Sequence, residues 1–409
     1  MSGTYQNNGQ YALETLELEF NSDGQVETVD LSAQLVVLNL YESMEHQVMT
    51  GNLSVMDTVD LPNILSLYGD EIIRVSFYTA GNEQNPITFE GRLYKISPKH
   101  RITEHAVGYT FYFHSQAASL SDRSFVHRGY QDNNHNIASD LYEYFLQGNS
   151  PKQLITTPTK GISSFCFGAI KPLEAISILE KQSVSDQGDH SYVFYENHES
   201  FVFKPLQELY RQEPVASYYY GAAGVFEDID KKHEESFEKI QAINIMDDNS
   251  FTDRLLDGLH GSRHVMFDLV TKTLMDGQDV VYDKESWFDP SKSLGNISVK
   301  QKIDKKDDCV FISYGSGVQD LLSHKDRIDS RMKRIELETF KCEIEVFGDS
   351  RTKVGDVLNC YIPNLNMDQE NIKNEFSGNM LITSIHHELI PTRYMQTIMI
   401  QKDSYEDLG

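Results

Sequence analysis

The most suggestive chemical pattern in the sequence is His387-Glu388-Leu389-Ile390-Pro391, which begins like the H-E-x-x-H motif of zinc proteases. Proline stands where that motif needs its second histidine, and the surrounding residues alternate between apolar and polar as in a strand. Successive side chains of a strand point to opposite faces, so two ligands could not share the helical face that such a zinc site requires. The alternation places His387 on the side of Ile385 and Leu389, and we predict a histidine packed in the core.

Other chemistry is only weakly indicated. Cys342 and Cys360 lie in strand patterns, where a cysteine is usually a small buried apolar residue, and with Cys166 and Cys309 they form no C-x-x-C pair, which favours a reduced compartment. No G-x-S-x-G elbow or G-x-x-x-x-G-K loop occurs. The 62 acidic residues leave accidental carboxylate pairs of a glycosidase type open. We therefore predict a protein that is not an enzyme, with no catalytic residue, no cofactor and no metal.

The strand that carries His387 belongs to a segment, 353–403, that has a counterpart near the N-terminus. Each copy has a Gly-Asp turn, then a Phe-x-Gly sequence that opens a strand, then an alternating apolar run. The distance from Gly69 to Gly91 is nearly that from Gly355 to Gly378, and such periodicity indicates an internal duplication. The matching segments are Gly69-Asp70 and Gly355-Asp356, Phe89-Glu90-Gly91 and Phe376-Ser377-Gly378, and Val107–Phe113 and Tyr394–Ile400.

Strand patterns dominate both ends of the chain. Leu16, Leu18 and Phe20 alternate with Glu17 and Glu19, as in a half-buried strand. Several short strands at this spacing favour a small antiparallel barrel or sandwich. Further strand patterns cover 35–41, 53–56, 72–78, 89–96 and 106–114, and a short helix is predicted at 60–65 with Asp60 as N-cap and Pro62 in its first turn.

The middle of the chain has a mixed pattern. Residues 135–146 and 172–181 show helical spacing, and 192–195 with 201–203 read as a β-hairpin. A strand is predicted at 237–246, a charged helix at 320–334, and a strand at 335–347. In this last strand the apolar residues face one way, and Lys341, Glu343 and Glu345 face the other.

These patterns predict an α+β fold that is mainly β, with two related antiparallel β-barrel domains and α+β insert domains between them. The predicted domains are 1–117 (first barrel), 118–206 (α+β insert), 207–245 with 335–403 (second barrel), 246–334 (inserted peripheral domain with a helix) and 404–409 (C-terminal tail).

The composition argues against two classes of function, nucleic-acid binding and membrane association. The formal net charge of −26 argues against simple nucleic-acid binding, which needs Lys and Arg to neutralise phosphates, and against an anionic membrane surface. The polar N-terminus shows no signal peptide, and no apolar run approaches the roughly 20 residues that span a bilayer. We expect no membrane anchoring.

The order and spacing of these motifs resemble the central baseplate hub protein of contractile-tailed phages of the T-even type, which is related to the hub part of type VI secretion spike proteins. The resemblance covers the two terminal β regions well and the middle poorly. The segments that carry it are Asn39–Ser43, Gly51–Asp57, Gly69–Ile73 and Ile382–Leu389.

The resemblance implies a homotrimer whose chains each give two tube domains to one pseudo-six-fold ring, which adapts the six-fold tail tube above to the three-fold central spike below. The implied partners are the spike protein, the tail tube or tube-initiator protein, and baseplate wedge proteins. The protein would be made in the host cytoplasm and reside in the tail baseplate of the virion. Double-stranded DNA would pass through the ring without specific binding, and an acidic lumen would repel phosphates. The candidate lumen-facing residues are Glu17, Glu19, Glu343 and Glu345.

Three alternatives stay open at this point. The first is the hub component of a bacterial contractile injection or type VI secretion system. Such hubs usually continue into a glycine-rich β-helical spike, whereas this sequence stops at Gly409, so we expect a separate spike protein. The second is a tail-associated cell-wall-degrading enzyme. The third is a receptor-binding adhesin.

Overall fold

The computed structural model describes most of the chain. The described residues are 9–22, 25–65, 67–69, 71–79, 81–221, 238–246, 262–277, 293–295, 297–298, 309–315, 330–338, 340–362 and 376–405. Asp70 of the predicted first Gly-Asp turn lies outside them.

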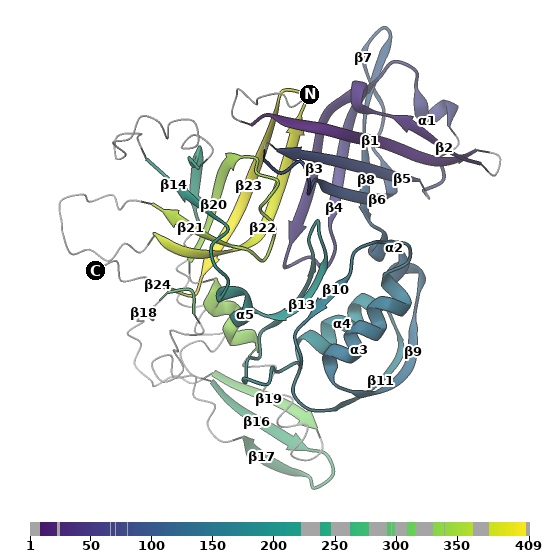
Figure 1. Ribbon diagram of the computed structural model, residues 1–409. Helices are drawn as coiled ribbons and strands as arrows, with labels where there is room; N and C mark the ends of the chain where they lie inside the picture. The colour runs from purple at the N-terminus through teal and green to yellow at the C-terminus, as the bar shows by residue number, and fades with distance from the viewer. Residues whose placement is uncertain are drawn as a thin grey trace.

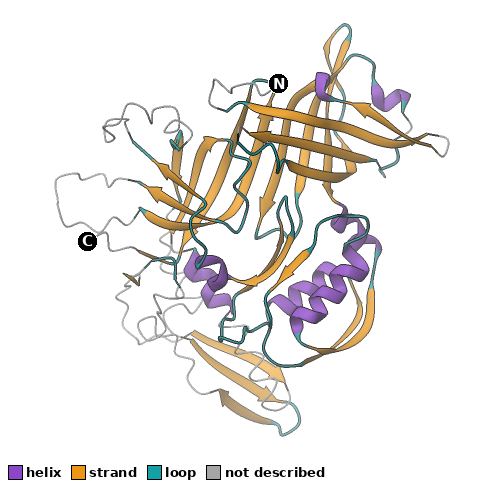
Figure 2. Cartoon of the chain, in the orientation of Figure 1, coloured by secondary structure: helices purple, strands orange, loops and turns teal. Residues whose placement is uncertain are grey.

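A single 14-stranded sheet runs through both ends of the chain (Figures 1 and 2). Its main path has the order β15-β20-β23-β22-β3-β4-β8-β6-β5-β1-β2; β14 and β21 join β22, and β7 joins β8. The strands are β1 (Tyr11–Ser22), β2 (Gln25–Asp30), β3 (Leu35–Ser43), β4 (Thr50–Asp57), β5 (Ile72–Thr79), β6 (Ile87–Ile96), β7 (His100–Thr103), β8 (Ala106–Ser115), β14 (Ala216–Tyr219), β15 (Ala242–Ile245), β20 (Phe340–Phe347), β21 (Val357–Tyr361), β22 (Gly378–Ile390) and β23 (Arg393–Lys402).

The two predicted repeats fold alike. β5, β6 and β8 form an antiparallel meander, and so do β21, β22 and β23. In both meanders a bulge interrupts the pairing of the second strand with the third. Just before each bulge, a backbone N–H of the second strand donates to the segment that leads into the first: Leu93 N to Glu71 O, and Ile382 N to Asp356 O, both at 2.9 Å.

The repeats are joined edge to edge, because β3 pairs antiparallel with the second half of β22. Among the described strands, β2 and β15 end the main path without pairing to each other, so these strands form one open sheet and no closed barrel. The mainly β, α+β character of the fold is therefore observed. The division into two barrel domains stays a prediction.

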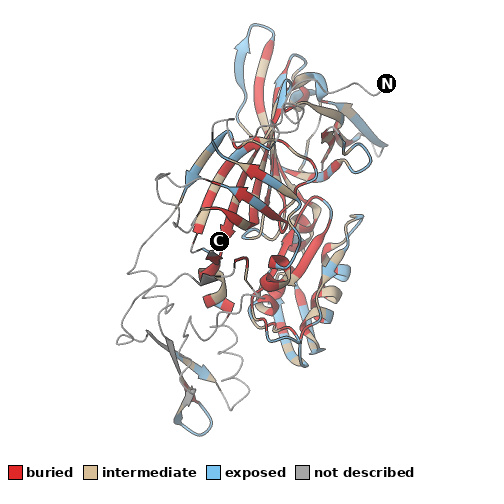
Figure 3. Ribbon diagram, turned by 60° about the vertical axis from the view of Figure 1, so that its left-hand side comes forward, coloured by how far each residue is buried: buried red, intermediate tan, exposed pale blue. Residues whose placement is uncertain are grey.

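An α+β body packs below the sheet, and Figure 3 shows buried residues concentrated in both. Its helices confirm the two helical patterns, and β12 with β13 confirms the hairpin. Its core includes Ile137, Ile176 and Phe203, all 0% exposed. The elements are α2 (Gln116–Arg123), β9 (Val126–Asp132), α3 (Asn134–Leu141) continuing into the π-helix η2 (Tyr142–Leu146), β10 (Leu154–Thr156), β11 (Ser163–Ile170), α4 (Pro172–Glu180), β12 (Tyr192–Glu196), β13 (Phe201–Pro205) and α5 (Leu206–Tyr210).

Smaller elements complete the described fold. A peripheral three-stranded sheet has the order β17-β16-β19, and β18 pairs with β24. Within the described residues, no helix is long and apolar enough to cross a membrane. These elements are η1 (Ser32–Gln34), α1 (Leu61–Ile64), β16 (Ser262–Asp268), β17 (Thr273–Gly277), β18 (Ile297–Ser298), β19 (Cys309–Gly315) and β24 (Ser404–Tyr405).

Three local predictions need correction. Residues 330–337 are helical, so the strand predicted at 335–347 begins only at Phe340. Of the helix predicted at 320–334, residues 320–329 lie outside the described residues. The strand predicted at 237–246 is shortened to β15 at the edge of the sheet. Asp60 makes no side-chain cap bond to α1, because Asp57 accepts from the N–H groups of Val59, Asp60 and Leu61 instead.

Candidate functional site

The four acidic residues predicted to face the lumen lie on one solvent-facing side of the large sheet. Directly paired residues of neighbouring strands point to the same side of a sheet, so a row of pairs defines a face. One unbroken row connects β1 to β20, and every side chain in it is exposed or half-buried. The row runs through Glu19, Ile72, Arg92, His114, Thr50, Tyr41, His386, Thr397 and Glu345.

Glu17 lies two residues before Glu19, and Glu343 two residues before Glu345, so all four carboxylates share this polar face. The structure does not bring the two pairs close together, since seven strands separate β1 from β20. The opposite face is buried and mostly apolar along the same strands, with Glu42 and His387 among its polar residues. Leu18, Leu40 and Ile344 are each 0% exposed there.

Charges on the polar face are mixed. The Arg74 guanidinium bonds both Glu19 and Glu90, and its Nε–Oε1 distance to Glu90 is 3.0 Å. Glu17, Glu343 and Glu345 form no ion pair with any described residue. The basic residues Arg92, Lys95 and Lys341 also lie on this face, as the strand pairings show. The face is therefore polar and rich in carboxylates but not uniformly acidic.

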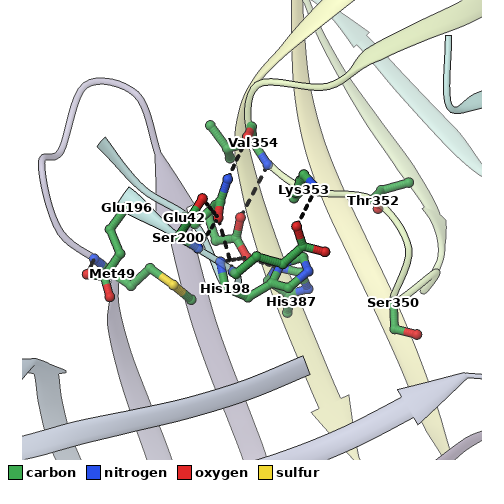
Figure 4. A network of polar contacts seen from close by, with 12 residues as sticks. Glu42, Met49, Glu196, His198, Ser200, Ser350, Thr352, Lys353, Val354 and His387 are labelled. Atoms are coloured by element: carbon green, nitrogen blue, oxygen red, sulfur yellow. Dashed lines mark hydrogen bonds and ion pairs between the residues drawn. The ribbon is translucent and has the colours of Figure 1, made fainter. Parts of the chain in front are cut away.

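A fully buried carboxylate lies where β3, β22 and the α+β body meet (Figure 4). Glu42 of β3 is 1% exposed. Its Oε1 accepts from the backbone N–H of His198 at 3.2 Å and lies 2.7 Å from His198 Nδ1, and its Oε2 accepts from Val354 N at 3.2 Å. His387 Nε2 of β22 lies 3.4 Å from the same carboxylate.

The electrostatics of this cluster favour a charged Glu42. Burial alone would raise the pKa of its carboxyl, but His198 and His387 together hold that pKa well below the ordinary value of 4.5. The anion thus draws donors from three segments far apart in sequence: β22, the β12–β13 turn and the turn before β21. The cluster ties the α+β body to the sheet.

A second buried pair reinforces this contact. Lys152 Nζ donates to Glu196 Oε1 at 2.8 Å and to Asn197 O at 2.7 Å. The other carboxylate oxygen of Glu196 accepts from Met49 N, just before β4, at 2.9 Å. The tip of the β12–β13 hairpin is therefore fixed to both β3 and β4.

The histidine of the cluster and two of the cysteines considered in the sequence are buried. His387 is 0% exposed, and its Nδ1 lies 2.7 Å from Tyr394 Oη, which confirms the predicted packed histidine. Cys342 and Cys360 are buried as predicted, and burial raises the pKa of the Cys342 thiol to about 12. In the described part of the chain, no group of three or more His, Cys, Asp or Glu side chains is arranged to hold a metal ion.

The sequence predicted the packed His387 but not its partner Glu42, nor the contacts of Glu42 with His198 and Val354. One signal was present, since Glu42 continues the apolar side of β3 that Leu38 and Leu40 begin, and a carboxylate at such a position must be paired. Two of its partners, His198 and Val354, could not be predicted, because they lie far from β3 in the sequence and no motif links them to it.

Comparison with known proteins identifies the fold. No protein-family model and no curated protein sequence matches the chain. Among solved structures, a tail protein from Neisseria meningitidis MC58 is similar with a TM-score of 0.58 and 9% identity, over 95% of this chain and 97% of that one. The 43 kDa tail protein of prophage MuSo2 from Shewanella oneidensis has a TM-score of 0.54 and 11% identity, over 95% and 97%.

A chain of a lidless PdpA–VgrG complex is also similar, with a TM-score of 0.50 and 8% identity, over 99% of this chain and 68% of that one. At such identities the likeness concerns the fold. The chain has the fold of phage tail proteins and of a VgrG-complex chain, in agreement with the resemblance found in its sequence.

Proposed function

We propose that this protein is the structural baseplate hub of a contractile phage tail. The observation that carries the proposal is a duplicated meander joined into one sheet, in a fold shared along nearly the whole chain with tail proteins. The two repeats would be tube domains, within 1–117 and within 207–245 plus 335–403. The segments 118–206 and 246–334 would lie outside the tube, and 404–409 would form a tail.

We infer that the hub is a trimer, because this state would match the symmetries of its neighbours. Three chains with two similar tube domains each give a ring of six similar units, while the rest of each chain repeats only three times. Such a ring matches a six-fold tail tube on one side and a three-fold central spike on the other. Wedge proteins would contact the outer segments, and the protein would reside in the virion tail after synthesis in the host cytoplasm, without membrane anchoring.

The polar face of the sheet would line the ring. Glu17, Glu19, Glu343 and Glu345 would then face the lumen, and carboxylates there would keep phosphates from binding while double-stranded DNA passes. Arg74 neutralises part of this charge, so the repulsion would come mainly from Glu17, Glu343 and Glu345.

A hub of a bacterial contractile injection or type VI secretion system is the second candidate, and the similarity to a VgrG-complex chain favours it. The structural role is the same in both. A cell-wall-degrading enzyme is a different class, and purified protein should show no turnover of peptidoglycan. A measurable rate abolished by substituting one carboxylate would replace our proposal with the enzyme.

Electron microscopy of the purified protein, alone and with the candidate spike protein, tests the proposal. End-on views should show a ring with six similar lobes and a three-fold outline around an open centre. Compact particles without a central opening, in both samples, would contradict it.

A further inference from the structure

One face of the peripheral sheet is apolar and points into solvent. Phe267 of β16 pairs with Leu274 of β17 on one side and with Tyr314 of β19 on the other, so the three side chains share a face. Val265 and Ile312 form the next pair on this face. The exposed fractions are 69% for Leu274, 70% for Tyr314 and 69% for Ile312, whereas Phe267 and Val265 are half-buried.

The opposite face of the same sheet is already covered. Met266 is 0% exposed and Asp268 is 3% exposed. Both alternate along β16 with the residues of the apolar face, so their side chains point to the other side. The sheet therefore buries one side within the chain and leaves an apolar side uncovered. Contiguous exposed apolar patches of this kind mark interaction sites.

The β16–β17 turn extends the apolar face and is held by hydrogen bonds. Leu269 follows Phe267 by two residues and is 59% exposed, and Val270 is 76% exposed. Asp268 Oδ1 accepts from Val270 N at 2.8 Å, and Leu269 N donates to Gly315 O of β19 at 2.9 Å. The apolar turn is thus ordered before any partner binds, which lowers the entropic cost of binding.

The size and composition of this surface indicate the kind of partner that it fits. Its five most exposed residues together present roughly 600 Å² to solvent, close to the ~800 Å² that each partner buries in a specific protein–protein interface. None of the residues that form it is charged, although the chain has a formal net charge of −26. A flat apolar sheet face packs well against a helix or another sheet. We call this surface the peripheral face; its residues are Val265, Phe267, Leu269, Val270, Leu274, Ile312 and Tyr314.

The peripheral face lies away from the parts that are proposed to form the ring. Figure 1 shows β16, β17 and β19 at the opposite end of the molecule from β1 and β7. A ring built from the two meanders would hold the peripheral sheets of its three copies apart. A different protein is therefore a better partner for this face than a second copy of the chain.

We propose that the peripheral face is a docking surface for a second tail protein that presents an uncharged, apolar helix or sheet face. The inference rests on the proposed hub function, and it specifies which surface outside the tube binds a neighbouring protein. One such surface on each chain would give three equivalent docking positions around the ring.

Hydroxyl-radical labelling of Leu274 and Tyr314 tests whether the peripheral face is covered. Both residues should be oxidised in the purified full-length protein, because both are exposed. In isolated tails that contain the chain, oxidation of both should be at least fivefold lower. Equal labelling in the free protein and in tails would overturn the docking surface and leave the hub intact, whereas absence of the chain from tails would contradict the hub itself.

A photoreactive residue at position 314 tests which protein covers the face. In tails assembled with Tyr314→p-benzoylphenylalanine, irradiation should join this chain to a different tail protein. A product with twice the mass of the chain would mean that a second copy covers the face, and it would overturn the proposed partner.

Leu274→Lys with Ile312→Lys tests whether the contact matters for assembly. When this variant replaces the natural chain, its amount in tails should fall at least tenfold, because an apolar contact leaves the ammonium groups desolvated and unpaired. Its unfolding midpoint should match that of the natural protein, since both side chains are exposed.

Ile155→Lys with Ile162→Lys is the matched control, because these residues are 46% and 68% exposed on the α+β body, and this variant should enter tails normally. Normal incorporation of Leu274→Lys with Ile312→Lys would overturn the docking surface. If that variant unfolds, the labelling of the natural protein in tails decides the question.

Discussion

At the scale of single residues, the most constrained side chain is the Glu42 carboxylate. It is buried at a point where three separate segments meet, and each of them supplies a donor or a histidine. A buried charge is tolerated only when its partners are complete, and loss of one partner typically costs several kcal/mol. Glu42 should therefore control how firmly the α+β body holds to the sheet.

Glu42→Gln should lower the free energy of unfolding by about 3 kcal/mol, because one acceptor oxygen becomes an NH₂ group facing donors. Urea denaturation followed by circular dichroism measures the loss. Glu343→Gln, on the open face of β20, is the matched control and should leave the midpoint unchanged. Equal midpoints for the two variants would mean that the Glu42 cluster does not hold the fold together.

The pH dependence of this effect has a defined sign. The folded-state pKa of Glu42 lies well below its ordinary value of 4.5, so its charge stabilises the fold above that pH. The advantage of the natural protein over Glu42→Gln should decline as the pH falls below 4.5. Denaturation midpoints of both proteins at a series of pH values measure it, and a gap that widens on acidification would contradict the assignment.

The glycines of the two Gly-Asp turns provide a second comparison. Gly355 and Gly69 both have positive φ, 96° and 88°, where a side chain costs roughly 1–2 kcal/mol. A Cβ at Gly355 would in addition overlap the buried Tyr195 hydroxyl, whereas at Gly69 it would meet only Leu93 O at 3.7 Å. Gly355→Ala should destabilise the protein more than Gly69→Ala in thermal unfolding, and the reverse order would refute this packing.

At the scale of elements, sequence periodicity predicted most strands of the large sheet, the repeat, and the helical segments 135–146 and 172–181 of the middle region; α2, α5, β9 and β11 were not predicted. The predictions from periodicity were wrong where a short segment fits both the strand and the helix pattern. Residues 335–337 continue an apolar alternation yet end a helix, because the pattern of a short segment fits both periods. The joint of β3 with β22 could not be predicted, since strand pairing between distant segments leaves no mark on either sequence.

The cap of α1 is a further example. Asp60 stands at the expected N-cap position but has φ of 62°, while Asp57, 0% exposed, supplies the side-chain bonds. Asp57→Ala should therefore destabilise the protein by about 1–3 kcal/mol. Asp60→Asn should have little effect, because asparagine tolerates that backbone conformation. Denaturation midpoints for both variants decide which aspartate is the cap.

At the scale of the whole molecule, the protein combines a duplicated unit, a two-faced sheet and a large negative charge. The net charge of −26 was visible in the sequence, but the sharing of one face by Glu17, Glu19, Glu343 and Glu345 emerges only from the pairing of all the intervening strands. Position, rather than total charge, is what would matter to DNA in a narrow channel.

Reversing charge on the proposed lumen should create DNA binding. Glu343→Lys with Glu345→Lys should retain linear double-stranded DNA in a gel-shift experiment at low salt and release it as salt rises, whereas the natural protein should not bind. Glu143→Lys with Asp186→Lys changes the net charge equally but lies on the α+β body. If this control bound DNA as strongly, net charge and not a lumen would explain the effect.

The most direct test of the central claim is the mass of the purified protein in solution, measured by light scattering over a concentration series. We expect a trimer of about 140 kDa, three times the chain mass of 46.8 kDa, either alone or on addition of the candidate spike protein. A monomer at every concentration in both conditions would contradict it.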